Sequence, residues 1–259
     1  MTRWFFTCLA AVLLSAPLSA QESPDLAAMG KKYGLEIITR APRFPVKMNT
    51  GEINGSAAAK TDVESYAELF AFEWSLYPPE LVKKSRLKCV VFCSDLTFAG
   101  QRRTAVPDFE HDVLYLDVAR GRTNDRYVRK VIHHEFFHLI DLRDDDHLYE
   151  DERWAKLNPP HFKYGPGGIN LQNDPTVTEP GKDAPGFLNR YAASGVEEDK
   201  AEVFAHLMVE PKAMSTRAGE DKYIRAKVER MKELLAEFSS KADENFWKKV
   251  EKAERPEVK

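Results

Sequence analysis

The sequence of 259 residues lacks the features that mark several protein classes. It has no internal repeat and no low-complexity tract, and its composition does not indicate a disordered chain, a collagen or a coiled coil. Neither charge sign dominates, since the formal net charge is −3, so we expect no nucleic-acid partner. Hydrophobic residues make up 43% of the chain, which is enough for one domain with a sizeable core, or at most two small ones.

Cysteine is also scarce, with three in the chain. Cys8 lies near the N-terminus, whereas Cys89 and Cys93 lie in an apolar segment, 87–93, that is typical of a buried strand. Four residues along a strand span roughly 13 Å, but a disulfide needs Cα atoms within about 7 Å. We therefore expect two free, buried thiols rather than a disulfide or a Cys-x-x-x-Cys metal site.

The first twenty residues differ from the rest of the chain. Arg3 precedes an apolar run from Trp4 to Leu14, and small residues follow at 15–20. This order is typical of a secretory signal peptide, which we expect to be removed after Ala20. A membrane anchor would need about 20 apolar residues, and the residues before Cys8 do not form a lipoprotein attachment box. We therefore expect an exported product, periplasmic or extracellular, with no stable membrane insertion.

Sequence patterns divide the remaining chain into three parts. Residues 21–85 are expected to form an irregular lead-in with one short helix and then a helix over 61–76, which Pro78-Pro79 ends. Residues 86–215 form the expected core. Residues 216–259 are expected to form C-terminal helices, and their alternating Lys and Glu are typical of a solvated face.

The expected core contains two strands and two long helices. In chain order, these are strands over 87–95 and 112–118 joined by a loop over 100–108, a helix over 125–142, a loop over 157–189 and a helix over 197–209. Asn124 is placed to cap the first helix, and Pro211 to end the second. A Pro/Gly/Asn-rich loop as long as the one over 157–189 is usually functional in a compact domain.

The helix over 125–142 contains the motif His134-Glu135-Phe136-Phe137-His138. Histidines at i and i+4 lie on one face of a helix and can bind one zinc ion, Zn2+. Glu135 follows the first of them, so its carboxylate can reach a water molecule beside the metal and act as a general base. The neighbouring His133 points roughly 100° away around the helix, so we expect it to be a supporting or surface residue rather than a ligand.

A catalytic zinc site usually has three protein ligands, and two places in the sequence could supply the third. Asp144 lies six residues after His138, as in metzincin-like sites, but those sites need a glycine where this chain has Asp141. Glu198 and Glu202 share a face of the helix over 197–209, so one could bind the metal while the other holds a histidine's second nitrogen. The residues alone favour this second place.

The motif and the later helix together resemble a known family. The matching residues are His134-Glu135-Phe136-Phe137-His138-Leu139-Ile140-Asp141, followed by Tyr191-x6-Glu198-x-x-Ala201-Glu202-x-Phe204. They resemble the gluzincin metallopeptidases, a group that includes the anthrax lethal factor catalytic domain, the bacterial Pro-Pro endopeptidases and other exported zinc peptidases. The resemblance covers roughly residues 87–210.

The resemblance implies a role for four further side chains. Glu198 matches the third zinc ligand of the family, and Tyr191 matches the tyrosine that stabilises the developing oxyanion. Glu202 matches a carboxylate that supports a ligand, and Asp141 matches a residue that steadies the motif helix. A phenol beside zinc could also be expected on chemical grounds to donate a hydrogen bond to a tetrahedral intermediate.

These observations predict an α+β, zincin-like metallopeptidase domain in which a small mixed sheet packs on the motif helix. In zincins an edge strand just before that helix binds the substrate backbone, and the strand over 112–118 is the candidate here. The predicted function is a secreted zinc-dependent endopeptidase acting on peptide or protein substrates. Two other hypotheses are a non-catalytic zinc-binding or interaction module and a hydrolase of non-peptide amides.

Overall fold

The computed structural model describes residues 24–121, 123–165, 167 and 185–256. The predicted signal peptide and most of the loop over 157–189 lie outside these residues, so neither prediction is tested. Among the described residues, no helix is both long enough and apolar enough to cross a membrane.

The described residues form α-helices, one 3-10 helix and short strands. The helices are α1 (Leu26–Tyr33), α2 (Lys60–Ser75), α3 (Pro79–Lys84), α4 (Asp125–Asp145), α5 (Glu152–Ala155), α6 (Val196–Val209), α7 (Pro211–Glu220), α8 (Lys222–Phe238), α9 (Glu244–Glu251) and the 3-10 helix η2 (Ala192–Ser194). The strands are β1 (Glu36–Ile38), β2 (Val46–Met48), β3 (Gly51–Ser56), β4 (Cys89–Phe98), β5 (Gln101–Arg102), β6 (Ala105–Asp108) and β7 (Val113–Asp117).

The strands form one mixed sheet in the order β2-β3-β4-β7-β6, with β1 and β5 also paired to β4. β4 is parallel to β1 and β7 and antiparallel to β3 and β5. Its side chains alternate: Val90 and Phe92 belong to the core shared with the helices, whereas Cys89, Val91 and Cys93 belong to a smaller core on the other face. Both cysteines are free and buried, as predicted.

The prediction of β7 as the edge strand is wrong, because β7 lies between β4 and β6. Its residues Leu114, Tyr115 and Leu116 are all buried, an unbroken run that suits a strand covered on both faces. The edge is β6, which lies inside the segment predicted as a loop. Pro107 within β6 has no backbone N–H to offer a further strand, and proline in sheets is confined mainly to such edges.

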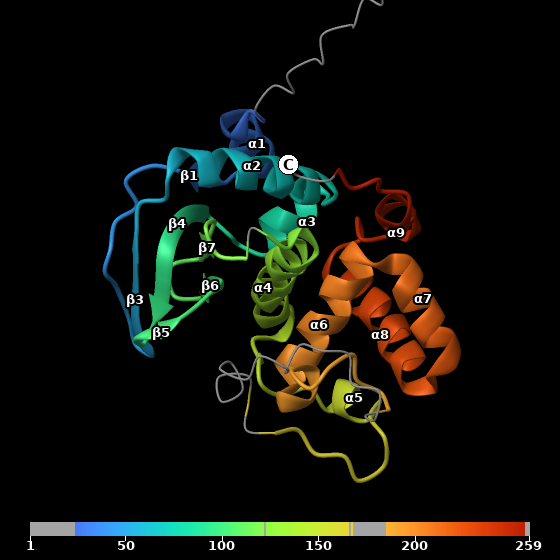
Figure 1. Cartoon of the computed structure of the whole chain (residues 1–259). Helices are drawn as coiled ribbons and strands as arrows, with labels where there is room; N and C mark the ends of the chain where they lie inside the picture. The colour runs from blue at the N-terminus through green and yellow to red at the C-terminus, as the bar shows by residue number, and fades with distance from the viewer. Residues whose placement is uncertain (1–23, 122, 166, 168–184, 257–259) are drawn as a thin grey trace, which may run out of the picture.

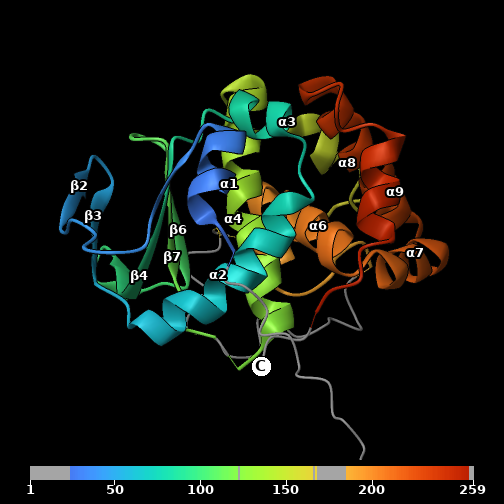
Figure 2. The ribbon, with the colours of Figure 1, turned by 90° about the horizontal axis from the view of Figure 1, so that it is seen from above.

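The motif helix α4 lies in the middle of the molecule, between the sheet and the C-terminal helices (Figure 1). Figure 2 shows the same arrangement from above, with α2 and α4 beside the strands and α6 beyond α4. This central place explains why α4 is apolar on several sides. Phe136 packs on Trp74 of α2, with ring centroids 4.8 Å apart, and Phe137 packs on Phe204 of α6 at 5.0 Å.

The predicted α+β fold class is therefore confirmed, including a small mixed sheet on the motif helix and further C-terminal helices. The N-terminal part is more regular than expected, because three short strands lie where an irregular lead-in with one short helix was predicted. Pro211 does follow the end of α6, but it also begins α7. Proline is well tolerated in the first turn of a helix, where its missing N–H has no partner to lose.

Candidate metal centre

Two helices supply the residues of the candidate metal centre. The Asn124 side chain caps α4 by accepting a hydrogen bond from the backbone N–H of Tyr127 at 3.0 Å, as predicted for this residue. No proline or glycine interrupts α4, so His134 and His138 lie one turn apart on the same face. Helix α6 packs against this face and brings Glu198 from its first turn.

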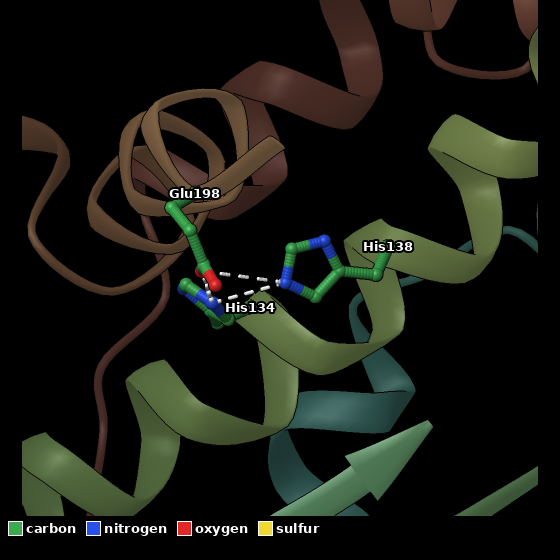
Figure 3. Close-up of side chains that lie close together, drawn as sticks. All are labelled: His134, His138 and Glu198. Carbon is green, nitrogen blue, oxygen red and sulfur yellow. Dashed lines mark hydrogen bonds and ion pairs between the residues drawn. The ribbon is translucent and has the colours of Figure 1, made fainter. Parts of the chain in front are cut away.

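The structure brings together His134, His138 and Glu198, all three of them buried (Figure 3). The two His Nε2 atoms lie 3.2 Å apart, and Glu198 Oε2 lies 3.0 Å from His134 Nε2 and 3.6 Å from His138 Nε2. Donors at the usual 2.0–2.1 Å from a tetrahedral zinc ion are separated by about 3.3 Å. The spacing therefore fits a single zinc ion.

The hydrogen bonding of His134 gives a second test of this fit. Its Nδ1 lies 3.1 Å from Glu202 Oε1, and a carboxylate can only accept, so Nδ1 carries the proton. In the neutral ring, Nε2 then carries no proton, and its lone pair faces the carboxylate oxygen of Glu198. Burial alone lowers the pKa of His134, but hydrogen bonds to Glu198 and Glu202 raise it well above its usual range. The carboxylates of Glu198 and Glu202 thus favour a positive charge at this position, which a metal cation would supply.

The supporting carboxylate of Glu202 is itself fixed by neighbours. Asn189 Nδ2 donates to its Oε2 at 2.7 Å, and His206 Nδ1 lies 3.6 Å from the same oxygen. Burial raises the pKa of Glu202, but its partners, His134 first, bring it down to about 2. Glu202 is therefore ionised at neutral pH and orients the His134 ring.

Tyr191 lies just before η2, at the mouth of the same site. Its hydroxyl donates to Glu198 Oε1 at 2.8 Å, and its ring centroid is 5.9 Å from that of His134. Burial, together with the charges of Glu198 and Glu135, raises the pKa of Tyr191 well above its usual range. The phenol thus keeps its proton and remains a hydrogen-bond donor next to the metal ligands.

Glu135 faces an open cleft of about 630 Å³ that also contains the three candidate ligands. No hydrogen bond or ion pair of its carboxylate involves a residue that the structure describes. Burial raises the pKa of Glu135 from its ordinary value, although His134 and His138 act against this. A partly buried, unpaired carboxylate beside a metal site is the arrangement expected of a general base.

Two further residues of α4 anchor the helix from behind the site. His133 is fully buried, and its Nε2 donates to Glu73 Oε2 of α2 at 2.9 Å, so its Nδ1 accepts from the Tyr77 hydroxyl. Asp141 pairs with Lys200 of α6 at 2.5 Å. His133 thus supports the helix and does not face the metal site, and Asp141 holds α4 against α6.

The alternative third ligand, Asp144, is exposed at the end of α4 and is not among the grouped residues. Sequence reasoning missed Asn189 and Glu73, because each acts through a contact between distant segments. It also missed Arg103, a buried cleft residue beside β6. Arg103 follows Gln101 and Arg102 and precedes Thr104, so its place in a polar segment gave no sign of burial.

Comparison with known proteins gives one structural likeness. A crystal structure from Bacteroides caccae ATCC 43185, described as that of a "putative zinc-binding metallo-peptidase", matches with a TM-score of 0.58 and 18% identity. The match covers 87% of this chain and 88% of that chain. No protein-family model and no curated protein matches this sequence. The likeness shows that the two chains share a fold, and the His-His-Glu triad fits a zincin.

Proposed function

We propose that the protein is a zinc-dependent endopeptidase that uses Glu135 as its general base. The convergence of His134, His138 and Glu198 at the wall of an open cleft carries this proposal. The fold likeness supports it, as does the resemblance of the motif to the gluzincin group of lethal factor and the Pro-Pro endopeptidases. Membership of that group, and export directed by residues 1–20, are parts of the same proposal.

The chain's own residues can perform the proton transfers of peptide hydrolysis. A zinc ion held by the triad would polarise a peptide carbonyl and lower the pKa of a nearby water molecule. Glu135 takes a proton from the attacking water and passes it to the leaving amine. Tyr191 donates its hydroxyl hydrogen bond to the carbonyl oxygen as negative charge develops there, which requires it to turn from Glu198 Oε1.

The free edge of β6 is the place where we expect the substrate backbone to bind. Within the part of the chain that the structure describes, β6 pairs on one side only, with β7, and Ala105, Val106 and Pro107 line the cleft. An extended peptide can add to such an edge as a further strand, although Pro107 itself has no N–H to donate to it. This assignment replaces the one made from sequence for the strand over 112–118.

The first test is digestion of a diverse peptide library by the zinc-loaded protein, residues 21–259, with products identified by mass spectrometry. The Glu135→Gln variant should keep one zinc per chain and lose about 100-fold or more of its turnover, because only the base is removed. Glu229→Gln on α8, which lies outside the cleft, is the matched control and should retain activity.

Two outcomes would count against the proposal. Zinc binding without any cleavage by the wild type would favour a non-catalytic zinc-binding module on this fold. Loss of zinc from Glu135→Gln would instead show that Glu135 belongs to the ligand set.

A further inference from the structure

The charged side chains of the cleft come in two groups, apart from Lys130 of α4, which pairs with Glu210 outside the cleft at 3.4 Å. The acidic group lies on α4 and α6 and consists of Glu135, Glu197, Glu198 and Glu202. The basic group lies at β5, before β6 and after β7, and consists of Arg102, Arg103 and Arg120. Two members of the acidic group belong to the candidate metal centre, since Glu198 is a candidate ligand and Glu202 holds His134. Among the residues that the structure describes, none forms an ion pair with the three arginines.

Arg103 stands out within this basic group because it is buried, with 9% of its surface exposed. Its Nη2 donates to the neutral Gln101 Oε1 at 3.2 Å, and its guanidinium carbon lies 5.9 Å from the centroid of the Phe98 ring. Its Nε is buried and has no hydrogen-bond partner. A guanidinium cannot lose its proton in a protein, and buried charges are ordinarily paired. The expected carboxylate partner is therefore missing from the described part of the chain.

The charges around Arg103 show where such a partner would lie. Burial lowers the pKa of Arg103, whereas Tyr191, Glu135 and Glu198 raise it, so all three lie within electrostatic range of the guanidinium. None of them is at ion-pair distance. The charge of Arg120 acts in the opposite direction, which places a second cation nearby. A ligand bound between the metal centre and β6 would thus meet two positive groups.

We propose, on the basis of the proposed function, that Arg103 recognises a carboxylate of the substrate close to the scissile bond. The planar guanidinium can donate two parallel hydrogen bonds to a carboxylate, which a neutral amide cannot match. The carboxylate can come from an Asp or Glu side chain or from a free C-terminus. Arg103 is in this view a specificity-determining residue rather than a member of the hydrolytic machinery.

The test compares carboxylates with their neutral amides in substrates. Zinc-loaded protein digests a library with both ends capped, and products are quantified by mass spectrometry. The wild type should prefer Asp or Glu over Asn or Gln at one position by about tenfold or more, the expected range for a charge-assisted hydrogen bond. Arg103→Gln should abolish this preference, because it removes the charge but keeps the backbone hydrogen bond from residue 103 to Leu96 O.

Two further variants separate recognition from a general structural effect. Arg103→Lys keeps the positive charge but cannot donate two parallel hydrogen bonds, so it should retain part of the preference. Arg126→Gln removes an exposed arginine on the same helix as the motif but outside the cleft, so it should leave the preference unchanged. An equal preference in the wild type and Arg103→Gln, with capped and with uncapped peptides alike, would overturn the proposal while leaving the peptidase function intact.

The source of the carboxylate is settled by repeating the digest with free C-termini. If the Arg103-dependent preference appears only there, the group recognised is the terminal carboxylate, and the enzyme removes residues from chain ends. If it appears with capped peptides, the group is an acidic side chain.

A binding measurement tests Arg103 even without cleavage. Two capped fluorescent peptide pools, one with Glu and one with Gln at each position in turn, are titrated into zinc-loaded Glu135→Gln protein. The Glu pool should bind about tenfold more tightly, and the added change Arg103→Gln should remove the difference. Equal binding of the two capped pools, together with equal binding of peptides with capped and free C-termini, would overturn the role of Arg103, whether or not the wild type cleaves peptides.

Discussion

One hydrogen bond decides which nitrogen of His134 can bind a cation. Glu202 accepts the Nδ1 proton at 3.1 Å, so the Nε2 lone pair points toward Glu198. Partners of this kind, one bond removed from a metal, fix both the tautomer and the orientation of a histidine ligand. We therefore expect Glu202 to contribute to metal affinity at the candidate centre without being a ligand.

The Glu202→Gln variant tests this contribution. It keeps the volume of the side chain but removes the charge that stabilises the Nδ1 proton, so zinc affinity should fall about tenfold or more. Competition with a chromogenic chelator at pH 7 measures the change. Glu210→Gln, at the other end of α6 and outside the cleft, is the control and should bind zinc as the wild type does.

At the scale of elements, α2 and α4 are joined by a buried charged cluster behind the metal site. We define the Glu73 cluster as Glu73, Arg129, His133 and Arg255. Glu73 Oε1 lies 2.5 Å from Arg129 Nη1 and 3.0 Å from Arg255 Nε, and His133 donates to Oε2. Burial raises the pKa of Glu73, but hydrogen bonding to His133 and the positive neighbours lower it from 4.5 to about 2.

This shift predicts an acid dependence of stability. Because the folded pKa is depressed, Glu73 stabilises the protein fully above its unfolded pKa, and that contribution is lost as the pH falls through about 2. The lost contribution is about 3 kcal/mol. Urea unfolding of zinc-free wild type and Glu73→Gln at pH 6, 4 and 3 measures this contribution. The difference between their free energies of unfolding should shrink toward low pH. A difference that does not vary with pH would contradict this assignment.

The two main elements of the site could be predicted from sequence because each has a strong local signal. The motif helix has helical periodicity, an N-cap at Asn124 and no interruption, and α6 was predicted within one residue of its start. The three-residue strands β1 and β2 were missed, because so few residues cannot show alternation. β6 was missed for a related reason, since a proline in a four-residue strand resembles a loop.

The site residues also divide into those that a local pattern predicts and those that it does not. The two histidines follow from their spacing alone, whereas the choice of Glu198 over Glu202 came from the family resemblance. The packing of α6 against α4 now gives a geometric reason, because Glu198 faces the Nε2 atoms and Glu202 faces Nδ1 of His134. Glu73 depends on contacts with residues 56 to 182 positions away, which no local pattern records, and Arg103 is distinguished only by its burial in the folded cleft.

At the scale of the molecule, the C-terminal segment returns to the motif helix. The Arg255 side chain binds Glu73 and the backbone carbonyl of Met208, and Arg129 Nη2 donates to the carbonyl of Pro256 at 2.6 Å. Residues 252–256 thus connect α2, α4 and the end of α6. The segment stabilises the arrangement that holds the two ligand-bearing helices together.

Ending the chain after Glu251 tests this role. The truncation removes Arg255 and Pro256, so the free energy of unfolding should fall by about 2 kcal/mol or more. Arg255→Gln in the full chain should reproduce most of the loss, and the exposed neighbour Glu254→Gln should not. Thermal unfolding followed by circular dichroism measures all three, and an unchanged melting temperature in Arg255→Gln would rule out the proposed role.

The separation of the cluster along the chain also sets an order of events during synthesis. Glu73 and Arg255 are 182 positions apart, and a chain made from its N-terminus acquires such a contact last. While the chain is still being made, Glu73 has Arg129 and His133 as partners but lacks Arg255. We therefore expect α2, α4 and the end of α6 to be fully fixed against one another only after residue 255 has been made, and the proposed peptidase activity to arise no earlier than that.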